Sequence, residues 1–250
     1  MKRVYYGLVF MVIITLNSCE KLFIDDSPGN ISGMGYNNGE LQIKEPYELP
    51  EVIVVIKPIA EGIIDGSLPR YGSGSVHLKI TLLNYSDTAK TVYFPKGLIF
   101  KCNSPDYHHL MLLQTCWICL QANGPKSFIL DTYCINTGKK HLAPPDVTFE
   151  ILGLSDSKVI NNLLDLIGWR KINYEMIIGA SPGPKTDAYL DIMQPLRDLV
   201  WKLVSPGGNI TNEDKTFIKS IPELSISEIP PKDSLGRFPD YFEEFVVKGK

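Results

Sequence analysis

In the stretch SVHLKITLLN, residues 75–84, polar and apolar side chains alternate from Ser75 to Leu82. A β-strand places such an alternating apolar set on one face, and the set here is Val76, Leu78, Ile80 and Leu82. A polar turn at residues 85–87 follows, and KTVYFPKGLIF (90–100) predicts two further short strands separated by Pro95. This region therefore predicts antiparallel strands that share one core face.

Further strands are predicted on both sides of it. EVIVVIK (51–57) is a continuous apolar run and predicts a buried strand. Residues 110–121 and 127–135 predict two long strands around Asn123-Gly124, because Asn-Gly between apolar runs is a strong hairpin signal. With a last strand at 147–153, the pattern is typical of an antiparallel immunoglobulin-like β-sandwich, which we assign to residues 41–153.

The period then changes to that of a helix. Apolar residues recur at helical spacing, with Ser155 or Asp156 as the N-cap and Gly168 near the end, and these apolar residues are Ile160, Leu163, Leu164 and Ile167. A second helix is predicted behind Pro195 as a first-turn residue, ending at Pro206-Gly207-Gly208, with Leu196, Leu199, Val200 and Leu203 as its apolar face. Thr211 caps a short third helix near 212–220.

The sequence thus predicts an α+β chain that is mainly β. A helical subdomain follows the strands over residues 154–221, and a proline-rich extended tail occupies residues 222–250. The chain without its first 18 residues has about 230 residues, which is enough for one large domain or two small ones.

The amino end has the pattern of an export signal. Lys2 and Arg3 precede the run from Val4 to Leu16, thirteen residues without a charge, which is too short to span a bilayer and fits the apolar region of a secretory signal. Leu16-Asn17-Ser18-Cys19 resembles the lipobox of bacterial lipoproteins. The resemblance implies a signal peptide over residues 1–18, cleavage before Cys19, and lipid attachment (acyl chains such as palmitate) at Cys19.

Residues 19–40 are rich in Gly, Asn, Ser and acidic residues and predict a flexible tether. Glu20, Asp25 and Asp26 resemble the acidic stretch of surface-exported Bacteroidetes lipoproteins. We therefore expect a lipid anchor in the bacterial outer membrane, with the folded part facing either the periplasm or the cell surface. Loss of Lys2 and Arg3 takes the formal net charge from −3 to −5, which gives no electrostatic signature for nucleic acid.

Two motifs resemble catalytic sites without meeting their chemical requirements. Gly179-Ala180-Ser181-Pro182-Gly183 matches the nucleophile elbow of hydrolases, yet Pro182 has no backbone N–H for an oxyanion, and all four histidines precede Ser181. Cys116 and Cys119 form a C-x-x-C inside a predicted strand, where residues three apart face opposite sides. We interpret both as buried cysteines, since a free cysteine behaves as a small hydrophobic residue.

The pairing of the remaining cysteines stays open at this point. A two-residue turn at Asn123-Gly124 would place Cys134 opposite Leu113, too far from Cys119 and on the wrong face for Cys116. A longer turn would shift this register and could bring Cys116 across, and Cys102 has no assigned partner. His108 and His109, beside Cys102, are interpreted as solvated loop histidines, because adjacent side chains in a strand diverge and no carboxylate pair lies nearby.

Tyr133-Cys134-Ile135-Asn136, followed by a helix with Val200-Trp201, resembles a sandwich family that includes bacterial thioester adhesin domains. In that family the cysteine bonds a glutamine four residues before the tryptophan. Arg197 occupies that position here and Gln194 is the nearest glutamine, so no thioester is expected.

The sequence predicts no catalytic residue, metal ligand or cofactor. The favoured function is a non-catalytic binding or structural module of the cell envelope that contacts a glycan, a host surface or another envelope protein. The alternative is an envelope glycan hydrolase, which needs two carboxyl groups about 5–10 Å apart in a cleft.

The lipobox gives a direct test. Cys19→Ala removes the predicted lipid attachment site, so the variant should leave the membrane fraction while its folded domain stays intact. Cell fractionation with circular dichroism of the released protein measures both. A variant that remains membrane-bound at the wild-type level would show that Cys19 is not the anchor.

Overall fold

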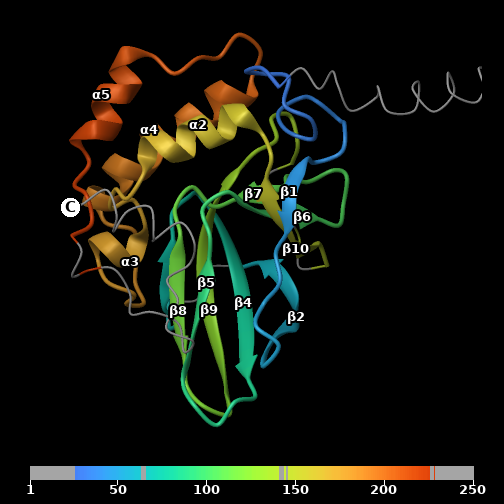
Figure 1. The fold of residues 1–250 in the computed structure, drawn as a ribbon, viewed down its shortest axis with the longest axis vertical. Coiled ribbons are helices and arrows are strands. Elements are labelled where there is room, and N and C mark those ends of the chain that lie inside the picture. The colour runs from blue at the N-terminus through green and yellow to red at the C-terminus, as the bar shows by residue number, and fades with distance from the viewer. Residues whose placement is uncertain (1–25, 63–65, 141–143, 145, 226–227, 229–250) are drawn as a thin grey trace, which may run out of the picture.

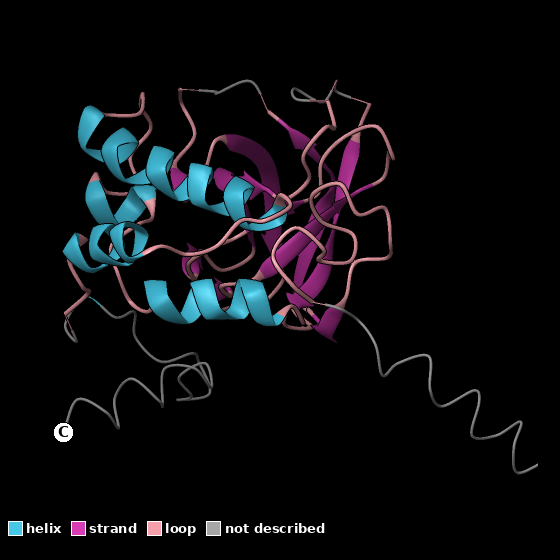
Figure 2. Cartoon of the chain, turned by 90° about the horizontal axis from the view of Figure 1, so that it is seen from above, coloured by secondary structure: helices cyan, strands magenta, loops and turns pink. Residues whose placement is uncertain are grey.

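The computed structural model describes residues 26–62, 66–140, 144, 146–225 and 228. Its strands form one body, and its helices gather together at one end and side of that body (Figures 1 and 2). The strands are β1 (Ile43–Pro46), β2 (Ile53–Glu61), β3 (Arg70–Gly72), β4 (Val76–Asn84), β5 (Lys90–Phe94), β6 (Leu98–Cys102), β7 (Leu110–Met111), β8 (Cys116–Leu120), β9 (Gly124–Cys134) and β10 (Thr148–Ser155). The helices are α2 (Lys158–Ile167), α3 (Tyr174–Ile177), α4 (Asp187–Val204) and α5 (Asn212–Ser220).

The main sheet closes on itself. Its strand order is β1-β10-β2-β4-β9-β7-β6, and β10 pairs with β6 as well as with β2. Six strands therefore form a closed barrel, with β1 added to β10 and β3 running parallel to β9. β5 and β8 make a separate two-stranded sheet.

The predicted class is confirmed at the level of a mainly β chain with antiparallel strands and a C-terminal helical segment. The observed sheet order differs from the immunoglobulin-like sandwich that we expected. A sandwich keeps two sheets with free edges, whereas here β10 joins two strands that would otherwise be edges. The strand signals are local, while this closure depends on pairing between distant residues.

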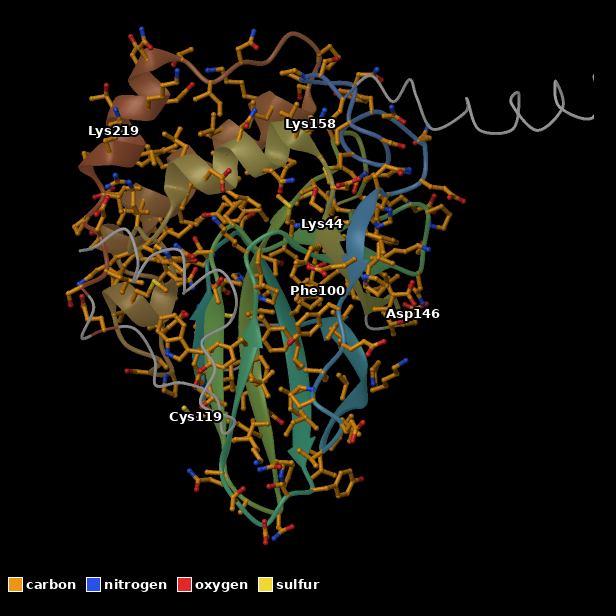
Figure 3. The ribbon with its side chains drawn as sticks, in the orientation of Figure 1. Lys44, Phe100, Cys119, Asp146, Lys158 and Lys219 are labelled. Carbon is orange, nitrogen blue, oxygen red and sulfur yellow. The ribbon has the colours of Figure 1, made fainter. Side chains whose placement is uncertain are left out.

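The apolar face predicted for residues 75–84 is buried, as expected. Val76, Leu78, Ile80 and Leu82 are all buried inside the barrel. Aromatic rings fill the same interior, where Tyr71 meets Phe128 edge-on at 5.7 Å between ring centroids. Phe100 lies among them, on β6 (Figure 3). The strands predicted around Pro95 and at 147–153 are confirmed as β5, β6 and β10.

The predicted hairpin around Asn123 is wrong in its pairing. Asn123 does adopt the positive φ of a tight turn, +47°. However, β8 pairs with β5, and β9 pairs with β4 over its length from Gly124 to Thr132. Leu110, not Leu113, lies opposite Cys134. The chain bends at residues 112–115, and this bend carries β8 out of the main sheet.

The apolar faces predicted for α2 and α4 are confirmed, but both helices begin at residues other than those predicted. Ser157, not Ser155 or Asp156, caps α2, and its hydroxyl accepts from the N–H of Ile160. α4 begins at Asp187 behind a Thr186 cap and carries Pro195 inside the helix. An internal proline removes one helical hydrogen bond. The apolar face extends upstream through Tyr189 and Met193, both buried, so packing holds this longer helix together.

α5 is confirmed as predicted. Thr211 and Asp214 form a reciprocal capping box at its start. After α5, Leu224 is buried and its N–H donates to the carbonyl of Trp169. Residues 226–227 and 229–250 of the predicted tail lie outside the described residues, as do the lipobox and Cys19.

Residues 26–40 correct the prediction of a tether that extends to residue 40. Ile31 and Met34 are buried in the core between the barrel and the helices. The Asp26 carboxylate accepts hydrogen bonds from the Ser157 hydroxyl and the Lys158 N–H. A carboxylate at this position complements the positive end of α2. A polar, glycine-rich composition therefore reflects tight turns here rather than flexibility.

Two more observations complete the fold. Residues 51–57 were predicted to be buried, yet Val52, Val54 and Ile56 are 38%, 37% and 43% exposed.

Within the part of the chain that the structure describes, no helix has both the length and the apolar character needed to cross a membrane.

The cysteines provide a test of this fold. All four in the described chain are free thiols, and only Cys119 on β8 is exposed (Figure 3). Burial raises the pKa of the Cys102 and Cys116 thiols and raises that of Cys134 to about 12, which suppresses the reactive thiolate. Of these four cysteines, alkylation should therefore modify Cys119 alone in the native protein.

Mass measurement after alkylation in denaturant, without reductant, should then show all four thiols modified. Two missing modifications that return on reduction would demonstrate a disulfide and contradict this arrangement.

Candidate functional site

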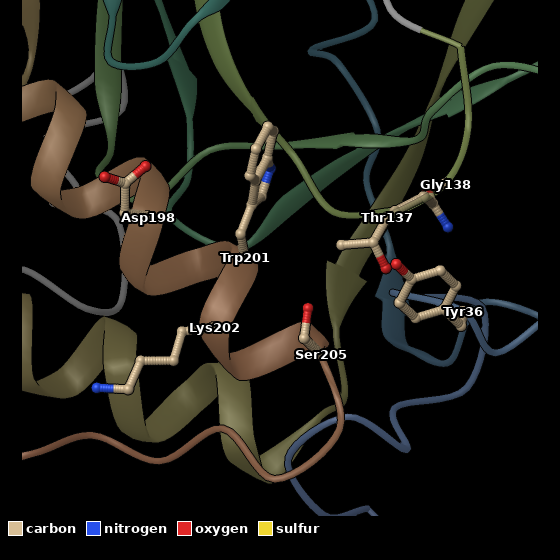
Figure 4. Close-up of a pocket in the computed structure, with 8 residues that line it drawn as sticks. Tyr36, Thr137, Gly138, Asp198, Trp201, Lys202 and Ser205 are labelled. Carbon is tan, nitrogen blue, oxygen red and sulfur yellow. The ribbon is translucent and has the colours of Figure 1, made fainter.

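A groove of about 430 Å³ lies between the second half of α4 and two loops (Figure 4). We call it the α4 groove, and it is lined by Tyr36, Asn136, Thr137, Gly138, Asp198, Trp201, Lys202 and Ser205. Its volume is in the range of ordinary small-ligand sites. The lining residues come from three distant segments of the chain, so the groove exists only in the folded protein.

Close backbone contacts build the groove from the N-terminal segment. The N–H of Gly35 donates to the carbonyl of Ile135 at 2.7 Å, and the N–H of Thr137 donates to the carbonyl of Gly35 at 3.2 Å. Gly35 has a φ of +61°, and a Cβ there would lie 1.8 Å from the carbonyl oxygen of Val204 on α4. Only glycine fits between β9 and α4 at this position.

Asn136 fixes the loop that follows β9. Its side-chain amide donates to the carbonyl of Gly33 at 2.9 Å, and its side-chain oxygen accepts from the N–H of His109 at 2.7 Å. The side chain is buried and fully engaged in these contacts. Asn136 therefore holds one wall of the α4 groove in place.

Two aromatic residues line the α4 groove. Tyr36 is 63% exposed, and its ring lies against Gly138, where a Cβ would come within 3.1 Å of the ring. Trp201 extends from α4, and the guanidinium of Arg197 lies 5.4 Å from the centre of its ring. Such a cation–π contact holds the indole in one orientation.

The charged groups of the groove are already paired. Lys202 donates to Asp214 on α5 at 2.7 Å, and Arg197 donates to Asp198 at 2.8 Å. The hydroxyl oxygen of Thr137, in contrast, is buried without a hydrogen-bond partner among the described residues. The α4 groove thus presents aromatic rings and neutral polar groups rather than an uncompensated charge.

A second polar cluster joins the barrel to the helical segment. Arg70 on β3 and Asp131 on β9 are both fully buried, and one guanidinium nitrogen lies 3.0 and 2.8 Å from the two carboxylate oxygens. His77 contacts the same carboxylate at 2.6 Å, and the Tyr189 hydroxyl of α4 donates to it at 3.2 Å. We call these four residues the Asp131 cluster.

Glu175 and Lys185 lie beside this cluster. The Glu175 carboxylate accepts from the N–H of Gly72 at 2.7 Å and from the Asn173 side chain at 3.0 Å. Burial, reinforced by the charge of Asp131, raises the pKa of Glu175 to about 8. Burial also lowers the pKa of Lys185 to about 8, although its ammonium donates to the carbonyl of Gly74 at 2.7 Å.

The structure separates the motifs that the sequence singled out. Ser181 is exposed, and its hydroxyl makes no hydrogen bond to a histidine within the described ranges. Cys116 is buried and Cys119 is exposed, which confirms that they face opposite sides of a strand. The prediction that both are buried is therefore wrong for Cys119, because one face of β8 is open to solvent. Among the residues that the structure describes, no cluster of His, Cys, Asp and Glu could hold a metal ion.

The histidine prediction is wrong. His108 is buried, and its Nδ1 lies 3.3 Å from the carbonyl oxygen of Asn136. His109 accepts at Nδ1 from the N–H of Cys102, and burial lowers its pKa to about 4. Both rings are therefore part of the barrel end rather than solvated loop residues.

Some of the residues that resemble the thioester family lie close together in the structure. Asn136 and Trp201 both line the α4 groove. Cys134 donates to the carbonyl of Asn136 at 3.4 Å and is a free thiol, while Arg197 lies against Trp201. The Tyr133 hydroxyl lies 2.6 Å from that of Ser73.

Sequence reasoning missed most of the site. Tyr36 lay in the predicted tether, and the polar residues of α4 carry no motif. One signal was present for the second cluster, because Asp131 is the only charged residue inside the apolar run SFILDTYCI. A charge in such a strand must find a buried partner.

The comparisons with known proteins give no family for this chain. No protein-family model matches it, and neither the curated proteins nor the solved structures include a match. The interpretation of the site therefore rests on its own geometry.

Glu175 predicts a pH dependence of stability. Its folded pKa of about 8 lies above the ordinary value of 4.5, so the folded state binds more protons and stability falls as pH rises from about 4.5 to 8, by on the order of 4 kcal/mol. Glu175→Gln should flatten the free energy of unfolding over this interval and raise it at pH 8 relative to wild type.

Denaturant unfolding at pH 5 and pH 8 measures the effect. Glu150→Gln, at an exposed carboxylate on β10, is the matched control and should keep the wild-type slope. The same slope in Glu175→Gln and wild type would show that Glu175 is not the group responsible.

Proposed function

We propose that this chain is a non-catalytic binding module of the bacterial outer membrane, anchored by lipid on Cys19, and that the α4 groove binds the saccharide part of a glycan. The observation that carries the proposal is the combination of two aromatic side chains with uncharged hydrogen-bonding groups in one groove. The envelope location is supported by the resemblance of residues 16–19 to a lipobox.

The aromatic residues suit the apolar faces of a sugar ring. A pyranose presents C–H groups on its faces and hydroxyl groups around its rim, and Trp and Tyr combine a large apolar ring with a polar group. Tyr36 is already exposed in the free protein. Its ring would be covered by such a ligand without any rearrangement of the core.

The polar groups suit the rim of the ring. A hydroxyl group both donates and accepts, so it can pair with another hydroxyl or with a carboxylate. The buried Thr137 oxygen has no partner among the described residues, and Ser205 and Asp198 line the same groove. A ligand hydroxyl that reaches Thr137 would remove the cost of an unsatisfied buried polar group.

The charge balance favours a neutral ligand. Lys202 and Asp198 each have an ion-pair partner outside the ligand space, Asp214 and Arg197. An anion or cation would have to compete with these partners. A neutral saccharide requires no such exchange, whereas a nucleotide or an acidic peptide would.

No observation in this groove supports the alternative, an envelope glycan hydrolase. Its mechanism requires two carboxyl groups facing the same glycosidic bond. Asp198 is the single carboxylate among the eight lining residues. Asp131 and Glu175 interact with each other outside the groove, but Asp131 is fully buried and held by Arg70 and His77.

The test is glycan binding by aromatic variants. Trp201→Ala and Tyr36→Ala should each weaken binding of the best ligand from a glycan array by about tenfold or more, since one stacked aromatic contributes on the order of 1–2 kcal/mol. Isothermal titration measures the affinity. Tyr85→Ala is the matched control, because Tyr85 is 64% exposed, as Tyr36 is at 63%, but lies outside the groove.

Circular dichroism must show that each variant keeps its fold. If the Trp201 and Tyr36 variants bind as tightly as the Tyr85 control, the α4 groove is not the binding site. If an array of neutral glycans gives no ligand for the wild-type protein, the proposed ligand class is wrong.

A further inference from the structure

The predicted lipid attachment point lies close to the α4 groove along the chain. Asp26 follows Cys19 by seven residues, and its carboxylate is fixed to the start of α2 through Ser157 and Lys158. Because seven residues of chain span at most about 25 Å, Asp26 lies within that distance of a lipid on Cys19, whatever path the intervening residues take.

The segment after Asp26 leads directly to the groove. The N–H of Gly29 donates to the carbonyl of Leu203 on α4 at 2.8 Å. A Cβ on Gly29 would lie 2.5 Å from the carbonyl carbon of Ser205, which lines the groove. Tyr36 belongs to the same segment and lines the groove as well. The chain that follows the predicted anchor thus forms part of the groove wall.

This segment and the groove share one end of the molecule. Residues 26–40 cross the end of α4 at one end of the longest axis, whereas β4 ends near the opposite end (Figure 1). β4 alone, with nine residues, extends over about 30 Å. We therefore expect a lipid on Cys19 to hold the groove nearer to the bilayer than the end of β4.

We propose that the α4 groove binds the saccharide headgroup of a glycolipid in the same membrane that holds the lipid on Cys19. This inference rests on the proposed function and adds the source of the saccharide. A soluble glycan is the other source of the same chemistry, and its binding requires no particular distance between the groove and the bilayer.

A small groove suits a ligand that is held nearby. Its volume of about 430 Å³ accommodates only a small part of a glycan, and its charged side chains are already paired. Few ligand atoms give a limited binding free energy, because the gain per atom is bounded. When protein and ligand are anchored in one membrane, the effective concentration of the ligand reaches roughly the millimolar range. A groove of modest affinity is then occupied by a glycolipid, whereas a dilute soluble glycan leaves it largely empty.

Energy transfer to the bilayer tests the position of the groove. The parent is the full chain with Cys119→Ser, purified with its lipid and placed in phosphatidylethanolamine vesicles that contain an acceptor-labelled lipid. Adding Asn38→Cys puts a donor dye at an exposed site two residues from Tyr36, and adding Asp87→Cys puts it at an exposed site just after β4. The Asn38 site should transfer energy about twofold or more efficiently, since the two sites differ in position by about the length of β4.

Equal transfer from the two sites, or stronger transfer from the Asp87 site, would overturn the inference. This measurement does not depend on saccharide binding, so such a result would leave the proposed function standing.

Glycolipid binding tests the source of the saccharide. The Asn38→Cys chain carries an environment-sensitive dye in phosphatidylethanolamine vesicles, with and without glycolipid extracted from the outer membrane of the producing cells. Glycolipid should change the dye emission. The same amount of its saccharide, cleaved from the lipid and added in solution, should give a response about tenfold smaller, because it lacks the effective concentration of a shared membrane.

Variants of the groove assign the response. Adding Trp201→Ala or Tyr36→Ala to the dye-labelled chain should remove most of the response to glycolipid, and circular dichroism checks that each variant is folded. Adding Tyr85→Ala, outside the groove, is the matched control and should keep the response.

An equal response to the free saccharide would show that the membrane is not the source, although the groove would still be a saccharide site. No response to glycolipid, in a protein that binds array glycans through Trp201, would also overturn the inference. Absence of every saccharide response would overturn the inference together with the proposed function.

Discussion

The buried ion pair between Arg70 and Asp131 is the constraint on which the arrangement of the whole chain depends. A buried carboxylate is costly unless its charge and its hydrogen-bonding capacity are both satisfied. Asp131 meets this requirement with partners from three places: Arg70 on β3, His77 on β4 and Tyr189 on α4. The barrel alone supplies two of these partners, and the helical segment supplies the third.

The hydrogen bonds of the Asp131 cluster tie the helical segment to the barrel. The Tyr189 hydroxyl also accepts from the N–H of Gly74, and Lys185 donates to the carbonyl of the same glycine. The start of α4 is therefore bonded to the chain that joins β3 to β4. Because α4 is a single helix from Asp187 to Val204, fixing its start also places Trp201 and Ser205, which form one side of the α4 groove.

The sequence predicted what depends on local pattern. The alternation at residues 75–84 and the helical spacing from Ile160 to Ile167 each appear as an element with the expected buried face. Barrel closure could not be predicted in this way, because the pairing of β10 with β6 joins residues about fifty positions apart. The extent of α4 was missed because Pro195 resembles a helix start, although tertiary packing tolerates it inside the helix.

The site was less predictable for the same reason. Tyr36 belongs to a glycine-rich stretch, and the sequence does not indicate that Gly35 packs directly against the backbone of Val204. Only this contact places Tyr36 beside α4. The run at 51–57 shows the opposite error. Its apolar composition predicts a buried strand, whereas Val52, Val54 and Ile56 are exposed in the structure.

Native-state hydrogen exchange tests most directly whether the Asp131 cluster joins the barrel and the helical segment into one cooperative unit. With increasing denaturant, the slowest amides of β9 and of α4 should converge on the same free energy of opening, that of global unfolding. Opening of α4 at a clearly lower free energy, with β9 still protected, would contradict the account.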